Sequence, residues 1–168
     1  MSMDQILQTL RSLDGVLELA PGPGSTYPEL AWGDHFFYYA PDGRVPEREQ
    51  PFATVVTKDY PDDTGSALDP PGRWRLNIHA GRQALAELAS DPDRADPTDP
   101  TDHTAAAAAD VVLPHPVYAA QGWVAVVNPA QRTRSLVARL LRQAHADAVR
   151  RAERRPRIPL PDPASGVE

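Results

Sequence analysis

The sequence has no cysteine, only one lysine in 168 residues, and no apolar run near the length of a membrane span. Without cysteine, the chain can form no disulfide framework, thiolate zinc site or iron–sulfur cluster, and it has no cysteine nucleophile. A helix that crosses a bilayer needs roughly 20 consecutive apolar residues, so we expect no membrane segment. The N-terminal residues are amphipathic and lack the basic start of a signal peptide. These absences together favour a cytoplasmic protein.

What remains is the composition of one globular domain. Hydrophobic residues make up 41% of the chain and charged residues 24%, which separates it from disordered proteins. Arginine supplies 16 of the 17 cations, and proline occurs 19 times. This bias is typical of coding in a GC-rich genome, so the number of arginines by itself is weak support for phosphate binding.

The hydrophobic patterns predict helices at both ends of a run of strands. An amphipathic helix is expected at residues 3–13, with Ser2 and Gln5 as a capping box. Segments 16–19, 35–40, 51–60 and 74–79 resemble strands and follow one another without intervening helices, which favours antiparallel pairing. Strict alternation of polar and apolar residues at 74–79 predicts a strand buried on one face only.

Three further elements complete the predicted domain. They are a helix at 81–90, a strand at 123–127 and a last helix that begins at Thr133 or Ser135 and ends near Glu153. We therefore predict an α+β fold over residues 1–154, with an antiparallel sheet of about five strands and helices packed on one face. The polar segment 91–104 is expected to be a loop, and the proline-rich residues 155–168 a disordered tail.

Several motifs resemble known families. Leu-Asp-Gly-Val at 13–16, Leu-Asn-Ile-His at 76–79 before a helix, and Trp123 in a strand before the last helix resemble the MmcQ/YjbR-like proteins. Leu-Pro-His-Pro-Val-Tyr at 113–118, Gln-Gly-Trp-Val at 121–124 and Val-Asn-Pro at 127–129 resemble more closely an uncharacterised actinobacterial group, domain-of-unknown-function family 6194. This closer resemblance spans about residues 3–153. The resemblance to the MmcQ/YjbR-like proteins implies a small α+β fold of the double-wing type.

The segment around His115 is the best candidate for a binding site. Pro114 and Pro116 restrict the backbone on both sides of His115, and Pro116 favours an extended conformation that would turn the imidazole away from the local backbone. Gly122 would allow a close approach of the chain before the next strand. The candidate ligand-binding residues are His115, Tyr118, Gln121, His79 and Tyr38. The alternative interpretation of His115 is a buried, hydrogen-bonded structural residue.

Charge is unevenly distributed and suggests a second kind of partner. Residues 1–130 carry 8 basic and 19 acidic side chains, whereas residues 131–157 carry 9 basic and 2 acidic ones. The last helix could contact nucleic-acid phosphates, but the acidic body would repel DNA, and the MmcQ/YjbR-like Lys and His before the strand tryptophan are missing here. The nucleic-acid candidates are Arg132, Arg139, Arg142 and Arg150.

The sequence therefore favours a non-catalytic binding module for a small molecule or a protein partner. Nucleic-acid binding through the last helix is the first alternative. An enzyme that uses His115 and Tyr118 as acid–base groups is the second. No histidine pair has metal-ligand spacing, and the acidic segment 91–104 lacks the glycine and terminal glutamate of a calcium loop, so we expect no metal and no cofactor.

Overall fold

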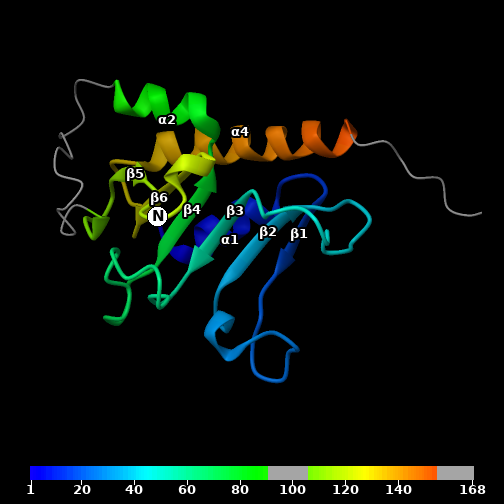
Figure 1. The fold of residues 1–168 in the computed structure, drawn as a ribbon, viewed down its shortest axis with the longest axis horizontal. Coiled ribbons are helices and arrows are strands. Elements are labelled where there is room, and N and C mark those ends of the chain that lie inside the picture. Colours follow the sequence, from blue (N-terminus) through cyan, green and yellow to red (C-terminus); the bar gives the residue numbers. More distant parts are fainter. Residues whose placement is uncertain (91–105, 155–168) are drawn as a thin grey trace, which may run out of the picture.

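The computed structural model describes residues 1–90 and 106–154, and these form one antiparallel sheet with helices on one face (Figure 1). The predicted loop at 91–104 and the predicted tail at 155–168 lie outside the described residues. In chain order the helices and strands are α1 (Met3–Arg11), β1 (Val16–Leu19), η1 (Glu29–Ala31), β2 (His35–Tyr39), β3 (Ala53–Val56), β4 (Arg75–His79), α2 (Gly81–Ala89), β5 (Val112–Pro114), η2 (Ala119–Gln121), β6 (Trp123–Val127) and α4 (Arg134–Glu153).

The sheet has six strands in the order β1-β2-β3-β4-β6-β5, and every pairing between neighbours is antiparallel. The α+β prediction with an antiparallel sheet is confirmed, but the prediction of about five strands is wrong. The strand not predicted is β5, in which Val112 pairs with Val126 and Leu113 with Ala125. Three residues ending at a proline are too short to show the alternation that identifies a strand in a sequence.

The first helix has the predicted N-terminal cap. The Ser2 hydroxyl accepts a hydrogen bond from the Gln5 N–H, and the Gln5 side chain accepts one from the Ser2 N–H. The helix ends at Arg11, two residues earlier than predicted, and Ser12 is its C-cap. Gly15 makes this turn with a φ of +64°, and a Cβ atom there would lie 2.6 Å from the Tyr39 ring.

The main core lies between the sheet and the helices, and Figure 1 shows α1 behind the strands. The central strands send alternate side chains into it, including Phe37, Val55, Leu76, Ile78 and Val124, all fully buried. The predicted inner face of the last helix is confirmed. Its core residues are Val137, Leu140, Leu141, Ala144 and Ala148, with Leu136 packed against them at partial exposure.

The start of α4 is held by a carboxylate from outside the helix. Asp110 accepts hydrogen bonds from the N–H groups of Ala130, Arg132 and Thr133 and from the Thr133 hydroxyl. Thr133 is the N-cap residue, but its side chain makes no capping bond to the helix. Burial alone would raise the pKa of Asp110, but these hydrogen bonds outweigh it and lower that pKa to about 2.

Strand β4 departs from the prediction of one buried face. Trp74, Leu76 and Ile78 face the core as expected, but Arg75 and Asn77 on the other face are also buried. The segment between β3 and β4 and the segment between β5 and β6 both fold back over this face. A strand that is polar on one face is exposed only where no other segment covers it.

In the described part of the chain, no helix is long and apolar enough to cross a membrane.

Candidate functional site

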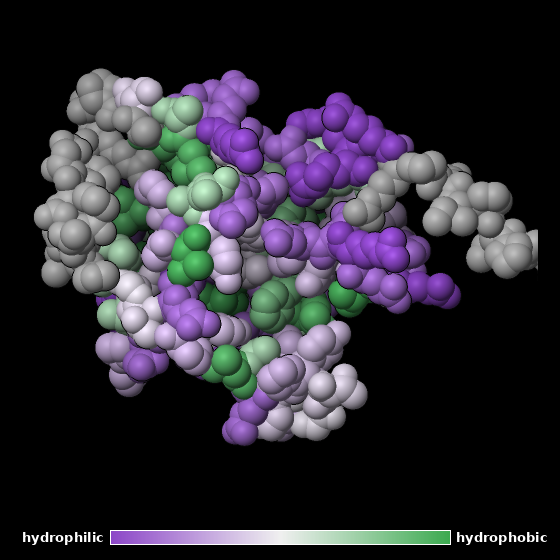
Figure 2. All heavy atoms as spheres, in the orientation of Figure 1, coloured by the Kyte–Doolittle hydropathy of each residue, from purple (hydrophilic) through white to green (hydrophobic). Residues whose placement is uncertain are grey.

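A cavity of about 580 Å³ lies on the sheet face opposite the helices. Figure 2 shows this face, where hydrophobic side chains gather around a hollow bordered by hydrophilic ones. The cavity is open to solvent, and its lining mixes apolar and polar groups. The lining residues are Leu30, Phe36, Gln50, Pro51, Thr54, Val56, Tyr60, Pro61, Asp62, Asp63, Arg75, Asn77, His115, Tyr118, Gln121 and Trp123.

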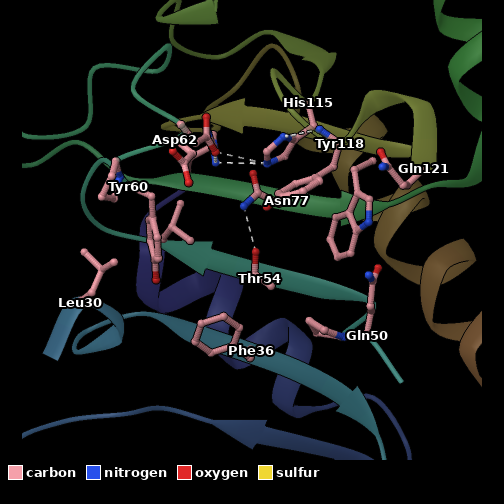
Figure 3. A pocket seen from close by; sticks show the side chains of 16 residues that line it. Leu30, Phe36, Gln50, Thr54, Tyr60, Asp62, Asn77, His115, Tyr118 and Gln121 are labelled. Atoms are coloured by element: carbon pink, nitrogen blue, oxygen red, sulfur yellow. Dashed lines mark hydrogen bonds and ion pairs between the residues drawn. The ribbon is translucent and has the colours of Figure 1, made fainter. Parts of the chain in front are cut away.

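The floor of the cavity comes from side chains on the face of the sheet that points away from the core. Phe36, Thr54 and Asn77 belong to three adjacent strands, β2, β3 and β4, and Figure 3 shows them one above the other. They share this face because their strand neighbours Phe37, Val55 and the apolar residues of β4 point into the core. Strand alternation therefore fixes the floor of the site.

Asn77 is the buried polar group of this floor. Its Nδ2 donates a hydrogen bond of 2.9 Å to the Thr54 hydroxyl, whereas its Oδ1 has no partner among the described residues. Asn77 is only 5% exposed. A buried acceptor without a donor costs about 1–3 kcal/mol, so this oxygen favours any ligand that brings an N–H or O–H group.

One wall is the segment after β3, which is fixed to the sheet by Arg75. The Arg75 guanidinium makes a two-pronged ion pair with Asp63 and donates a 2.8 Å hydrogen bond to the Ser66 hydroxyl. Arg75 is only 2% exposed. Its positive charge is matched by Asp63, so Arg75 serves to position the wall.

Tyr60 belongs to the same wall and has a fixed orientation. Its hydroxyl donates a 2.6 Å hydrogen bond to Asp34, a fully buried carboxylate that also accepts from the N–H and hydroxyl of Thr57. Burial, followed by the interaction with Asp34, raises the pKa of Tyr60 strongly. The phenol proton is therefore held by Asp34, and the ring itself lines the cavity.

The opposite wall contains the segment predicted from the sequence, and three of its candidates meet there. His115, Tyr118 and Gln121 all line the cavity, and Figure 3 shows them on the same side of it. The rings of His115 and Tyr118 have centroids 4.9 Å apart. Tyr118 is half exposed, whereas His115 is 3% exposed.

The predicted orientation of His115 is wrong. Its Nδ1 accepts hydrogen bonds from the N–H groups of Val117 and Tyr118, at 3.1 and 3.2 Å, so the imidazole turns toward the local backbone. A ring nitrogen can replace a backbone acceptor in a tight turn, and this stabilises the turn more than an extended side chain would. His115 is therefore a buried structural residue that also forms part of the cavity wall.

The second nitrogen of His115 faces the ion pair of Arg75 and Asp63. Since Nδ1 accepts two N–H groups, the proton of the neutral ring resides on Nε2. That nitrogen is 3.2 Å from Nη2 of Arg75 and 3.7 Å from Oδ2 of Asp63. Burial and then the charge of Arg75 lower the pKa of His115 to about 4, against the opposing effect of Asp63. The imidazole is thus neutral near pH 7.

Gly122 shapes the approach to β6. Its φ is +91°, and a Cβ atom there would lie 2.9 Å from Cα of Gly81. The Gly81 N–H also donates to the Gly122 carbonyl at 3.0 Å. The close approach expected at Gly122 is confirmed, because two glycines let the start of α2 contact the end of η2.

The other two sequence candidates lie outside the cavity lining. His79 lines a smaller hollow of about 200 Å³ with Arg48, Glu49 and Arg151, separated from the cavity by Gln50 and Pro51. Its Nε2 lies 3.0 Å from the Gln121 carbonyl oxygen, and burial lowers its pKa. Tyr38 is on β2, next to the edge strand β1, and lines neither hollow.

The nucleic-acid candidates are on a different part of the surface. Arg132, Arg139, Arg142 and Arg150 are exposed, the last three on the outer side of α4. Helix α4 packs on the sheet face opposite the cavity, and Arg150 forms an ion pair with Asp147. The two surfaces are therefore separated by the sheet.

Sequence reasoning missed most of the floor and one wall. Arg75 and Asn77 had a detectable signal, since they are the polar residues of a strictly alternating central strand. Tyr60 ends the predicted strand at 51–60, and no pattern there marks it as a site residue. Asp62 and Asp63 lie in a segment rich in Pro, Asp and Gly that predicts only a loop. Among the described residues, no group of three or more His, Asp or Glu side chains is placed to hold a metal.

Comparison with known families places the chain in one of unknown function. The model of that family, DUF6194, matches residues 1–157. The chain thus belongs to the DUF6194 family. No curated protein and no solved structure matches it.

Proposed function

We propose that this protein binds a small organic molecule in the cavity on the sheet face. The observation that carries the proposal is the cavity itself. Its volume of about 580 Å³ falls within the range of roughly 300–1,000 Å³ that is usual for small-molecule sites. It combines rigid aromatic rings with a few buried polar groups, as such sites do.

A protein partner, the other ligand expected from the sequence, is supported less well. Asn77 and His115 lie at the bottom or in the wall of a hollow, whereas protein interfaces place their main contacts across a broad surface. Tyr118 and Leu30, which are 50% and 42% exposed, form the rim. They would contact either kind of ligand.

The geometry of His115 does not favour the enzyme alternative. A general base needs an unshared nitrogen lone pair that faces the substrate. Nδ1 of His115 accepts two backbone N–H groups, and Nε2 faces Arg75 and Asp63. Tyr118 would then have no neighbouring base to take its proton. We therefore propose binding without catalysis.

Two finer expectations from the resemblance remain proposals. The run of helix, strands, helix, strands and helix is compatible with the double-wing type of the MmcQ/YjbR-like group. An actinobacterial origin and a cytoplasmic location are likewise expected from the sequence motifs and composition.

Amide and indole NMR signals of the ¹⁵N-labelled protein, recorded with a panel of aromatic fragments, test the proposal. We expect shifts concentrated at the side-chain amides of Asn77 and Gln121 and at the Trp123 indole, with dissociation constants of about 0.1–5 mM, as is usual for fragments. Gln50→Trp should block the rim and weaken binding at least about tenfold. Gln8→Trp, an exposed change on α1, is the matched control. Binding unaffected by Gln50→Trp, or shifts confined to α4, would contradict the proposal.

A further inference from the structure

The charges that line the cavity do not balance. Of its lining residues, Asp62, Asp63 and Arg75 carry a formal charge, and His115 is neutral near pH 7. Arg75 and Asp63 neutralise each other through their ion pair. Asp62 is exposed and makes no ion pair with the described residues, so the lining has one unmatched negative charge and no unmatched positive charge.

Aromatic rings line the same cavity as that charge. Phe36, Tyr60, Tyr118 and Trp123 all line the cavity. Figure 3 places Tyr60 on the same side as Asp62, Phe36 below, and Tyr118 on the far side. Aromatic faces carry negative partial charge, and an ammonium group within about 6 Å of a ring centroid gains roughly 0.5–2 kcal/mol.

One buried acceptor in the lining can also receive a hydrogen bond from a ligand. The Tyr60 proton is already given to Asp34, and one of the two Nδ2 hydrogens of Asn77 to Thr54. Two buried atoms of the lining have no partner among the described residues, the donor Nε of Arg75 and the acceptor Oδ1 of Asn77. The charge of Arg75 is already matched by Asp63, so a donating ligand would satisfy the Asn77 oxygen.

We propose that the cavity selects organic cations, with an ammonium group beside Asp62 and an apolar body against the rings of Phe36, Tyr60 and Tyr118. This inference rests on the proposed function and names the ligand class for the same site. A carboxylate or phosphate ligand would meet the unmatched charge of Asp62 without a compensating cation. The excess of acidic residues over residues 1–130 attracts cations to the same region.

Three probes that share a phenylethyl body test the inference. They are 2-phenylethylamine, which is cationic at pH 7, 2-phenylethanol and 3-phenylpropanoate. The dissociation constant of each is measured from NMR shifts of the ¹⁵N-labelled full chain at low ionic strength. We expect the amine to bind at least about tenfold more tightly than the carboxylate, with the alcohol between them.

Two matched pairs of variants assign the selectivity to residues. Asp62→Asn should weaken amine binding about three- to tenfold and leave the alcohol unchanged, because only the charge is removed. Asp42→Asn, an exposed change outside the cavity, is its control. Tyr118→Leu should reduce the preference for the amine over the alcohol, and Tyr27→Leu, an exposed tyrosine outside the cavity, should not.

The possible failures are distinguishable. If the amine and the carboxylate bind the cavity equally, or Asp62→Asn changes nothing, the cation inference is wrong and the cavity remains a binding site. The same holds if the carboxylate binds the cavity more tightly than the amine. If no probe shifts Asn77, Gln121 or Trp123, both the inference and the proposed function are overturned.

Discussion

His115 illustrates how one residue can be structural and still belong to a binding site. It joins three segments, since its Nδ1 holds the turn at 117–118 and its Nε2 faces Arg75 of β4 and Asp63 of the segment after β3. Its ring also supports Tyr118 at the rim. Replacing it would therefore alter the stability of the cavity wall before it altered any contact with a ligand.

We expect His115→Ala to lower the free energy of unfolding by about 1–3 kcal/mol, because a buried ring is removed and two part-buried N–H groups lose their acceptor. His115→Asn should recover part of this loss, since an asparagine oxygen can accept from the N–H two residues further along the chain. Denaturant titration of both variants measures the difference. A loss below about 0.5 kcal/mol for His115→Ala, as for an exposed residue, would contradict this role.

His115 should also make the protein acid-sensitive between about pH 6.5 and pH 4. The pKa is lowered in the folded state, so the unfolded chain binds the proton first as the pH falls. Stability is therefore expected to decrease by about 2–3 kcal/mol across this interval. In His115→Asn, which does not titrate there, the unfolding free energy should change less with pH. An equal slope in both proteins would assign the acid sensitivity to other groups.

At the scale of elements, hydrogen bonds in the loops between helices and strands fix where a helix begins. Asp110 lies in the loop before β5 with a φ of +56° and accepts hydrogen bonds from the backbone of the turn that leads into α4. The N-cap residue Thr133 donates to this carboxylate instead of capping the helix itself. The start of α4 thus depends on a residue more than 20 positions earlier.

Asp110→Ala should lower the unfolding free energy by about 1–3 kcal/mol, because it removes these acceptors and places alanine in a left-handed conformation. Asp110→Asn is expected to lose less, since asparagine tolerates a positive φ and keeps one acceptor oxygen. Thermal unfolding at pH 7 compares the two. Similar losses for both variants would show that the charge, rather than the hydrogen bonds, holds the helix.

At the scale of the whole molecule, the sheet separates two surfaces of different character. One face holds the cavity with its unmatched Asp62, and the other is covered by α4 with its exposed arginines. An acidic body with a basic helix is dipolar, and its net charge of -6 would repel a polyanion at a distance.

Random duplex DNA is therefore expected to bind no more tightly than about 10⁻⁴–10⁻⁶ M at physiological salt, as for ordinary nonspecific binding. Fluorescence anisotropy over a range of salt concentrations measures this. Submicromolar binding that weakens steeply with salt, and that the double variant Arg139→Ala and Arg142→Ala abolishes, would instead favour the nucleic-acid alternative.

The sequence alone was enough to predict most of the helices and strands of this protein. Capping residues and hydrophobic periodicity act over a few positions, so they determined the start of α1, the inner face of α4 and the central strands. The same patterns identified the segment at 115–121 as one side of a candidate site.

Only the tertiary structure decided what that segment faces. The cavity needs Asp62 from a loop without periodic signal, and it needs Arg75 and Asn77 buried on a strand face that alternation assigned to solvent. Strand β5 likewise forms because Val112 pairs with Val126 of β6. The three residues of β5 are too few to show a hydrophobic pattern of their own. These outcomes depend on which distant segments cover one another, and local propensity does not encode that choice.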